Sequence, residues 1–423
     1  MKTRLLSTLF FLVVAFVFSI PELRAEEIVI TALPPDDAPP ASSSAKSPTS
    51  FVETVKVKPL GQGLIDTQSA LRLSVGVDLP DYGGCVTAPT SLRGTNFNQT
   101  LVTIDGMPLS SSLGDMVNLS LFSLPEIDRI EVVKGSNSAA FGGSAMGGAI
   151  NFATRGPSMQ DSVELTSSQG SFGANLYNLL INTEHQGTGL MLGITRSWAE
   201  NDFMYEREEG TDVKRENSAT DTRSILGKVL FDIDGWDTTL MADTADQSAG
   251  SPGTEGYLTP QDDSDTTQSL FMLSTMKNFN PDHRFSLRIS RLMNRSHTLT
   301  GYSGDVWSKL SSDTVDALYT ARMGMVELSP GVTIRKEGVS SDDYGIHARS
   351  VSSGSLKSDI DLAPVLLSLG LRYDHSTAFD GHWSYHGGVK YKASKNFSLR
   401  ANAGTGYSEP TIGQLYTPST FMT

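Results

Sequence analysis

The 423-residue chain has a single cysteine, Cys85, and so cannot form an intramolecular disulfide bond. Basic side chains are also scarce, with 33 Lys and Arg against 47 Asp and Glu. This acidic balance argues against nucleic acid as a partner. Beyond residue 20 no apolar stretch reaches the roughly 20 residues that a membrane-spanning helix needs, and hydrophobic residues make up only 38% of the chain. The sequence therefore excludes a helical membrane protein.

Motifs of enzymes are missing as well. No G-x-S-x-G elbow or H-E-x-x-H pair occurs, and the seven histidines are scattered. The glycines between Gly142 and Gly148 have a G-x-x-x-x-G spacing, but no Lys followed by Ser or Thr comes after the second glycine, so no phosphate-binding loop is predicted. Asp105, taken alone, reads as a turn residue. We predict no catalytic residues, no required cofactor and no enzyme.

The first residues have the features of an export signal. Lys2 and Arg4 precede an apolar run from Leu5 to Ile20, and Leu-Arg-Ala at 23–25 provides a small-residue cleavage site. A transmembrane anchor is the alternative, but the run is shorter than the roughly 20 residues that a bilayer requires and has no basic stop-transfer flank. We assign residues 1–25 to a signal peptide.

The longest part of the chain, residues 158–423, consists of short alternating segments divided by polar loops. Alternation with a period of two is typical of transmembrane β-barrel strands, although a soluble β-sandwich or propeller explains any single segment equally well. Connections alternate between tight ones, such as 186–189, and long polar ones at 200–221 and 247–266. This alternation favours a barrel with turns on one side of the membrane and loops on the other.

The segment between Ser91 and Arg155 is punctuated by glycines. Leu101–Ile104 is predicted to be a strand that stops at an Asp105-Gly106 turn, and Asp128–Lys134 a second strand that ends at Gly135. Four further glycines then allow a sharp, close-packed backbone path before a third strand, Ala149–Thr154.

These residues carry a resemblance to a known family. SLRGTNFNQTLVTIDGMPLSS and SLPEIDRIEVVKGSNSAAFGGSAMGGAINFATR, in that order and spacing, resemble the plug domain of TonB-dependent outer-membrane receptors. The resemblance is specific over residues 51–157 and extends more loosely to NAGTGYSEPTIGQLY at 402–416. The recurrent plug positions of the family are occupied here by Arg93, Gly94, Asp105, Gly106, Arg129, Glu131, Gly135, Gly142, Gly147, Gly148 and Asn151.

The resemblance implies a mainly β fold, with a small α+β plug domain at 51–157 followed by an antiparallel transmembrane β-barrel at 158–423. It implies a location in the outer membrane of a Gram-negative-type bacterium, with outer-membrane lipid around the barrel. Residues 161–423 can supply about 14 strands, whereas plugged transporters of this kind have about 22. The last residues, Phe421-Met422-Thr423, lack a terminal aromatic. We therefore expect the barrel to be C-terminally truncated.

The start of the mature chain, 26–50, has an apolar segment followed by a tract of mostly Pro, Ser, Ala and Asp. Within the resemblance, Glu27-Ile28-Val29-Ile30-Thr31-Ala32 matches the TonB box, which docks to TonB of the TonB-ExbB-ExbD complex. An extended segment with β-branched residues can add to the edge of a partner's sheet through backbone hydrogen bonds. We expect the tract to be a flexible tether that leaves the box free. A frayed terminus left by processing is the alternative.

The function implied is energy-coupled import of a large scarce solute, an iron siderophore or cobalamin. The loops at 200–221 and 247–266 loosely resemble those of cobalamin receptors, and haem is less favoured because no paired loop histidines occur. Asp262, Asp263 and Asp265 are candidate calcium ligands, with a solvated acidic loop as the alternative. A passive porin, a surface adhesin and a soluble exported β-enzyme are alternative functions, but none of them explains residues 91–155.

Overall fold

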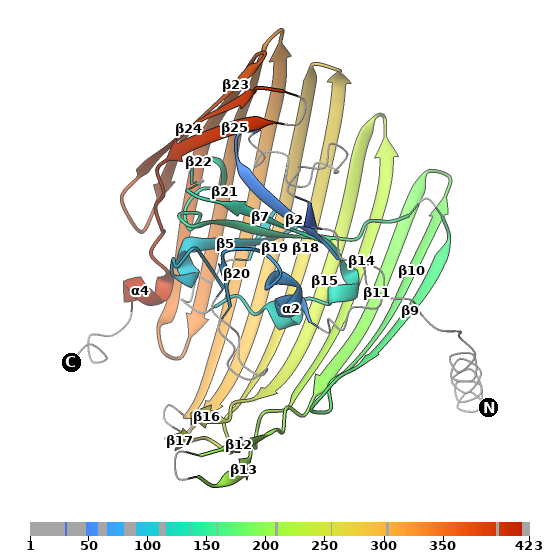
Figure 1. Ribbon diagram of the computed structural model, residues 1–423, viewed down its shortest axis with the longest axis vertical. Coiled ribbons are helices and arrows are strands. Elements are labelled where there is room, and N and C mark those ends of the chain that lie inside the picture. The colour runs from blue at the N-terminus through green and yellow to red at the C-terminus, as the bar shows by residue number, and fades with distance from the viewer. Residues whose placement is uncertain are drawn as a thin grey trace.

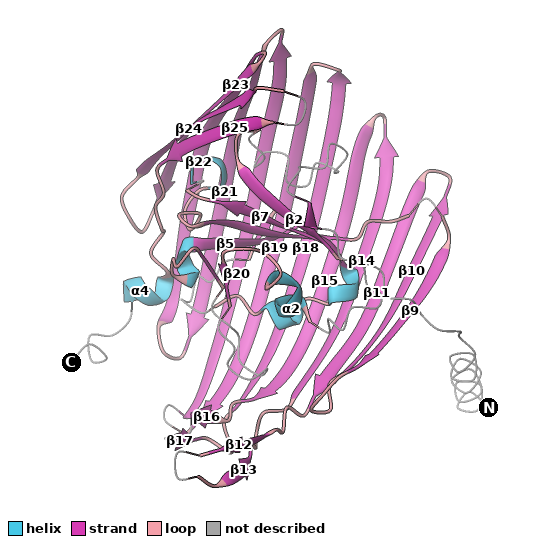
Figure 2. Ribbon diagram, viewed as in Figure 1, coloured by secondary structure: helices cyan, strands magenta, loops and turns pink. Residues whose placement is uncertain are grey.

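The computed structural model describes residues 30–31, 48–57, 66–79, 90–109, 116–136, 138–158, 160–207, 210–254, 256–301, 304–394 and 397–416. The signal peptide, Cys85, and the box residues Glu27, Ile28, Val29 and Ala32 lie outside the described residues. The described part consists of a small plug with its own sheet and a large curved sheet of long strands that partly surrounds it (Figures 1 and 2).

The plug contains a six-stranded sheet in the order β1-β2-β7-β8-β5-β6. Only the β5–β8 pair is parallel, and the other pairs are antiparallel. The strands are β1 (Ile30–Thr31), β2 (Phe51–Lys56), β5 (Thr100–Ile104), β6 (Met107–Pro108), β7 (Ile127–Lys134) and β8 (Gly148–Thr154). A separate pair is formed by β3 (Val77–Asp78) and β4 (Ser91–Leu92). The helical turns are α2 (Thr67–Leu71), η2 (Phe97–Gln99), η3 (Leu119–Leu121), η4 (Leu124–Glu126) and α3 (Ser138–Phe141).

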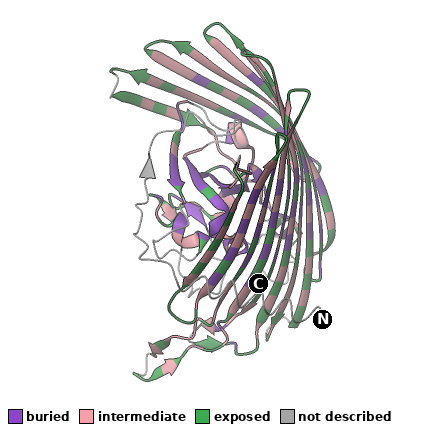
Figure 3. Cartoon of the chain, turned by 90° about the vertical axis from the view of Figure 1, so that its right-hand side faces the viewer, coloured by how far each residue is buried: buried purple, intermediate pink, exposed green. Residues whose placement is uncertain are grey.

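The core of the plug lies on its two central strands. All seven residues of β8 are buried, as are the apolar side chains of β7. A strand buried on both faces needs a mostly apolar run, which AINFA within β8 and IEVV within β7 provide, each with one polar residue, Asn151 and Glu131. Phe122 stacks on Phe152 with the ring centroids 6.2 Å apart. Helical turns and the wall of the large sheet cover this core (Figure 3).

The large sheet has 13 strands, all antiparallel between neighbours, and its edges in the described part of the chain are β9 and β25. The sequence predicted about 14 strands in this region. The strands are β9 (Ser162–Gln169), β10 (Asn175–His185), β11 (Thr188–Ala199), β14 (Thr220–Ile233), β15 (Trp236–Gly250), β18 (Asp263–Asn280), β19 (His283–Thr300), β20 (Gly304–Met323), β21 (Val326–Ser341), β22 (Gly345–Leu362), β23 (Val365–Ser376), β24 (His382–Lys392) and β25 (Ser398–Gly404). A short helix, α4 (Ile412–Tyr416), follows.

Connections at one end of this sheet are short: five are two-residue turns, at 186–187, 234–235, 281–282, 324–325 and 363–364, and the sixth, between β24 and β25, spans 393–397. The other end, called the loop end below, carries the longer connections. Two of these contain small hairpins: β12 (Met204–Glu206) with β13 (Asp212–Lys214), and β16 (Gly253–Thr254) with β17 (Tyr257–Leu258). The loops predicted at 200–221 and 247–266 are therefore shorter than expected, because β14, β15 and β18 extend their antiparallel ladders into both ranges.

Side chains of the large sheet alternate between the plug and the outside. In β10, Leu176, Asn178, Leu180 and Asn182 are buried toward the plug, whereas Tyr177 is exposed on the outer face. Aromatic side chains gather near both ends of that outer face, as the Trp236–Phe279 and Tyr177–Trp198 ring pairs show. Aromatic belts at both borders of an apolar band are typical of proteins that cross a membrane with strands.

One backbone pairing involves the start of the predicted mature chain. Ile30 and Thr31 form β1 and pair antiparallel with Val55 and Thr54 of β2. In this structure these two residues of the predicted TonB box are paired, because the edge of β2 offers backbone groups that an extended segment can pair with. Among the described residues, no helix is long and apolar enough to cross a membrane.

Candidate functional site

The Asp105-Gly106 turn forms one contact between the plug and the wall of the large sheet. Both residues have positive φ, 47° and 77°, as a two-residue type I′ hairpin turn requires. The Asp105 carboxylate accepts hydrogen bonds from the backbone N–H and the hydroxyl of Thr154, at 2.9 and 2.6 Å. It also pairs at 2.8 Å with Lys228 of β14, and both side chains are almost fully buried. Arg288 of β19 donates to the Gly106 carbonyl at 3.0 Å.

Asn151 joins the predicted plug residues into one polar network. Its side-chain oxygen accepts from the Thr103 hydroxyl at 2.8 Å and from the Gly106 N–H at 2.9 Å, and its NH₂ group donates to Glu131 at 3.2 Å. Glu131 in turn pairs with Arg129 at 3.0 Å. Five positions singled out in the sequence, at 105, 106, 129, 131 and 151, thus meet at one end of β5, β7 and β8.

The remaining predicted plug residues shape the backbone. Gly135, Gly142 and Gly148 have φ of 99°, 87° and 138°, a region that residues with a side chain rarely adopt. A Cβ at Gly148 would overlap the carbonyl oxygen of Val133, and one at Gly147 would lie 2.5 Å from the Thr95 hydroxyl. Arg93 and Gly94 form the tight turn after β4, with φ of 54° and 76°.

Glu126 is a buried carboxyl group between the plug and the large sheet. It accepts hydrogen bonds from Thr195 of β11 at 2.8 Å and from Asn178 of β10 at 3.3 Å. Burial raises the pKa of Glu126 to about 8, the Thr195 hydrogen bond opposes this rise, and the nearby Asp243 adds to it. The group is therefore largely protonated at neutral pH and holds the plug to the wall as a neutral acid.

The segment that links β25 to α4 also contacts the plug. The Ser144 N–H donates to the Tyr407 carbonyl at 3.2 Å, and the Ser408 hydroxyl donates to the Asn98 carbonyl at 3.0 Å. Glu409 fills the space beside Gly143, where a Cβ would overlap its side chain. The carboxylate of Glu409 pairs with Arg335 of β21. Arg349 of β22 pairs with Glu337 of β21. Together, Arg335, Glu337, Arg349 and Glu409 are called the Arg335 cluster below.

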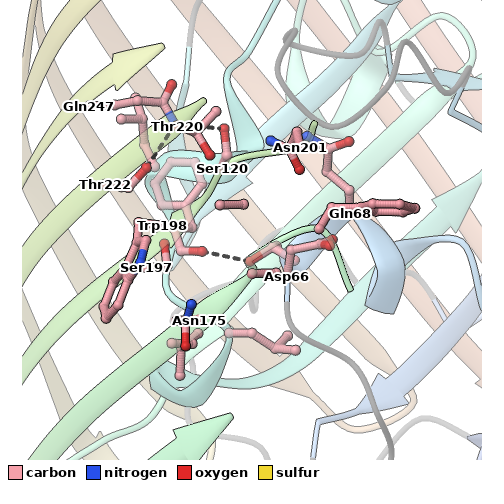
Figure 4. Close-up of a pocket in the computed structure, with 18 of the residues that line it drawn as sticks. Asp66, Gln68, Ser120, Asn175, Ser197, Trp198, Asn201, Thr220, Thr222 and Gln247 are labelled. Atoms are coloured by element: carbon pink, nitrogen blue, oxygen red, sulfur yellow. Dashed lines mark hydrogen bonds between the residues drawn. The ribbon is translucent and has the colours of Figure 1, made fainter. Parts of the chain in front are cut away.

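A pocket of about 1080 Å³ opens between the plug and the sheet at the loop end (Figure 4). The plug contributes α2 with its flanking residues and the η3–η4 segment, and the wall contributes β10, β11, β14 and β15. The loops supply Phe172, Phe203, Arg215 and residues 251–253. The pocket therefore lies where a solute arriving from the loop end meets the plug.

Uncharged polar side chains greatly outnumber charged ones in the lining of the pocket, and they alternate with apolar side chains. Gln247 illustrates how they are connected: its NH₂ group donates to Thr222 at 2.8 Å and to Ser120 of the plug at 3.1 Å, and its oxygen accepts from Asn118 at 2.6 Å. Aromatic rings border the opening, with the Phe172 and Phe203 centroids 5.6 Å apart. The other amide and hydroxyl groups are those of Gln68, Asn175, Asn201, Thr67, Ser123, Thr195, Ser197, Thr220, Ser224 and Ser251.

Only three charged residues are found among the described residues that line this pocket, and two have clear partners within the protein. Asp66 caps α2 by accepting from the Ser69 N–H at 2.6 Å. Arg215 donates to the Gly253 carbonyl at 3.2 Å and lies over the Phe203 ring, 5.9 Å from its centroid. The third is Arg72. The lining thus offers many neutral hydrogen-bonding groups and little net charge.

The predicted calcium ligands do not come together. Among the described residues, no group of three or more His, Cys, Asp or Glu side chains has the arrangement of a metal site. Asp262 accepts from the Gly301 N–H at 2.9 Å, and Asp265 accepts from the Ser248 hydroxyl. Asp263 and Asp265 are two residues apart on β18, about 7 Å along the strand.

Several residues of this site were missed in the sequence. Lys228 carried a usable signal, because it occupies the inward phase of an alternating strand between Leu226 and Leu230, where a charge needs a partner. Glu126 and the Arg335 cluster carried none, since their partners are distant in sequence. Asp105 was interpreted as a turn residue and as a recurrent plug position of the family, and its ion pair with Lys228 was not predicted.

Comparison with known proteins places these features in a family. Residues 45–149 match the TonB-dependent Receptor Plug Domain, and residues 150–422 match the TonB dependent receptor-like, beta-barrel family. The second match alone covers more than half of the chain. The border between the two matches falls within β8, which pairs with β5 and β7 of the plug.

Individual relatives are more distant. The chain is 23% identical over 360 residues to the vitamin B12 transporter BtuB of Photobacterium profundum, covering 82% of this chain and 57% of that one. BtuB of Vibrio vulnificus is 23% identical over 387 residues, with 82% and 58% covered. The chain thus spans less than three fifths of the length of these relatives.

Solved structures show the same fold. The ferric citrate transporter FecA superposes with a TM-score of 0.72 at 17% identity, over 87% of this chain and 64% of that one. The siderophore receptor PiuA of Acinetobacter baumannii superposes with a TM-score of 0.70 at 14% identity, over 88% and 66%. Identities this low establish the fold and leave the solute open.

Proposed function

The chain belongs to the TonB-dependent receptors, which are non-enzymatic transport proteins of the Gram-negative outer membrane, and from this we propose that it imports a large solute with energy supplied through TonB. The pocket between plug and sheet carries this proposal. It opens at the loop end, which is extracellular in outer-membrane barrels, and its floor is the plug. A solute bound there would rest on the element that has to move.

We further propose that the solute is neutral and rich in amide groups, of the cobalamin type, rather than an anionic iron chelate. A ferric catecholate carries several negative charges, and its recognition calls for a cluster of free Lys or Arg side chains. The described lining has only two basic residues, and Arg215 already interacts with Gly253 and Phe203. The amide and hydroxyl groups of the pocket lining can both donate hydrogen bonds to neutral amides and accept hydrogen bonds from them. Similarity to vitamin B12 transporters supports the same choice.

The contacts of the plug suggest how binding and energy input act together. Ser120 and Asn118 of the η3 region belong to the pocket's hydrogen-bond chain through Gln247, so a bound solute would act directly on this part of the plug. On the other side, β1 places two box residues at the edge of the plug sheet. A pull by TonB on the box would reach β2 and then β7 through backbone hydrogen bonds, in the manner of β-strand addition.

The proposal is tested by separating binding from accumulation. Cells with the full chain should bind labelled cobalamin without energy and accumulate it only when TonB is present and energised. A ferric catecholate serves as the competing solute. Binding of the catecholate with no binding of cobalamin would overturn the choice of solute, and equal accumulation with and without TonB would overturn energy coupling.

A charge variant sharpens the choice of solute. Gln68→Glu adds a carboxylate to the pocket with almost no change in shape. A neutral solute should lose less than about twofold in affinity, whereas a multiply charged anion should lose roughly tenfold or more through repulsion. Gln160→Glu, on an exposed residue outside the pocket, is the matched control.

A further inference from the structure

The outer face of the large sheet is organised in rows that cross neighbouring strands. One row is apolar throughout and runs over seven strands from β11 to β21. Each residue in the row is the direct antiparallel partner of the next, so all of them face the membrane side together. Its members are Leu190, Val229, Leu240, Leu273, Ile289, Val315 and Ile334.

The next row toward the loop end contains a hollow. Here Gly227 and Ala242, two small residues, lie between Leu192 and Phe271. A groove of about 870 Å³ follows, lined almost entirely by alkyl and aromatic side chains, and it extends under β19 and β20 as far as Arg291 and Asp313. A long apolar groove on a lipid-facing surface fits an acyl chain.

Two rows closer to the loop end, the same face carries two pairs of like charges. Arg196 is directly opposite Arg223, and Arg295 is directly opposite Lys309. Like charges in this position destabilise a sheet unless a counter-ion lies between them. The first pair has one in the protein, because both arginines contact Asp221, at 2.9 and 3.0 Å.

Arg295 and Lys309 form no ion pair or side-chain hydrogen bond within the described part of the chain, and both are exposed. Four carboxylates in this part of the face have partners elsewhere. Asp313 pairs with Arg291 at 3.3 Å, and Asp305 with His297 at 2.6 Å. Two more accept from hydroxyls: Asp246 from Thr267, and Asp265 from Ser248.

We propose that Arg295 and Lys309 bind the phosphate of an anionic lipid of the outer leaflet, whose acyl chains occupy the neighbouring groove. The phosphate would take the place that the Asp221 carboxylate has between Arg196 and Arg223. Arg295 lies four residues, about 13 Å, from Arg291 at the rim of the groove on the same strand. Basic groups just beyond an apolar band are at the depth of lipid headgroups.

The test measures lipid retained by the purified full chain. The protein is reconstituted in phosphatidylcholine doped with phosphatidylglycerol or with bisphosphorylated lipid A, and bound lipid is counted by native mass spectrometry after transfer to detergent. The wild type should retain the phosphate-bearing anionic lipid in preference to phosphatidylcholine. Arg295→Gln with Lys309→Gln should lower that preference roughly tenfold or more, because each basic group near an anionic surface contributes about a factor of five.

Two matched variants separate this proposal from a general loss of charge. Arg196→Gln with Arg223→Gln removes the same two positive charges from the same row, where the Asp221 carboxylate already occupies the place between the two basic groups, and retention should stay within about twofold of wild type. Gly227→Leu fills the groove, and a side chain is accommodated there, since the nearest atom to its Cβ is 3.9 Å away. This variant should lose retained lipid while its strand circular dichroism stays that of the wild type.

Equal retention of phosphatidylcholine and anionic lipid by the wild type would overturn the proposal. So would unchanged preference in the Arg295→Gln, Lys309→Gln variant, or equal loss in both double variants. Retention of inorganic phosphate from the buffer in place of lipid would overturn the lipid as the source of the phosphate.

Discussion

Replacing Glu126 with glutamine isolates the contribution of one buried acid to the hold between plug and sheet. Glutamine has the shape of the protonated carboxyl group, and its oxygen can still accept from Thr195 and Asn178. It cannot ionise. A difference between the two proteins that changes with pH therefore comes from ionisation of Glu126 and from its electrostatic coupling to the nearby Asp243.

The pKa values of Glu126 in the unfolded and folded states decide whether the free energy of unfolding rises or falls with pH. In the unfolded chain the carboxyl group titrates near its ordinary pKa of 4.5, and in the folded protein burial raises the pKa to about 8. Below 4.5 both states are protonated and there is no penalty. Between the two values the unfolded chain releases a proton that the folded protein keeps, so the free energy of unfolding falls as pH rises. Above about pH 8 the penalty is complete.

The size of the effect is bounded by the same shift. At about 1.4 kcal/mol per pKa unit, the loss in free energy of unfolding has an upper limit of about 5 kcal/mol. Relaxation of the protein around a buried charge reduces this loss to about 2–3 kcal/mol. Wild type and Glu126→Gln should have equal stability at about pH 4.5, and the variant should be more stable by this amount above pH 8.

The assay follows urea unfolding of the full chain in detergent, together with hydrogen exchange of the β7 and β8 amides, from about pH 5 to about pH 9. Glu131→Gln is the control, because it breaks a buried ion pair with Arg129 and should destabilise the plug throughout this range. The reasoning is refuted if Glu126→Gln keeps the pH dependence of the wild type, or if it is the less stable protein at pH 8.

Three further predictions address single contacts. Gly148→Val should destabilise the plug by about 3 kcal/mol or more, because φ is 138° and the Val133 carbonyl blocks the Cβ, whereas Gly156→Val meets open space and should change stability by less than about 1 kcal/mol in the same urea titration. Lys228→Met leaves Asp105 buried and unpaired and should cost about 3–5 kcal/mol in unfolding experiments, while adding Asp105→Asn should recover most of it; no recovery would argue against the ion pair. Ile28→Pro or Val29→Pro in the box should abolish accumulation of labelled solute in a complete receptor and leave binding intact, with Val29→Ala nearly normal, because proline removes a backbone donor; normal uptake by the proline variants would leave the segment as a processing remnant.

Local sequence patterns predicted the parts of this fold that depend on local physics. The Asp105-Gly106 turn needs positive φ at both residues, and that requirement is visible as a D-G pair. The alternation of the long strands is visible because one face meets the plug and the other the membrane. The pocket could not be predicted in this way, since Gln247 and Ser120 are 127 positions apart and meet only through the register of the wall. The same holds for Glu126, whose environment is made by β10 and β11.

The link between plug and wall decides which movements are open to the plug. Strand β8 ends at Thr154 and β9 begins at Ser162, so the seven intervening residues can span at most about 24 Å. Arg155 shortens the reach of this link further. Its guanidinium pairs with Glu164 of β9 at 2.7 Å, and its N–H donates to the Glu126 carbonyl of the plug at 2.8 Å. The plug is thus held by a short link to the β9 edge of the sheet. If the plug moves to admit solute, we expect the passage to open on the far side, along β21 to β23, where the ion pairs of Arg335 with Glu409 and of Arg349 with Glu337 would have to separate.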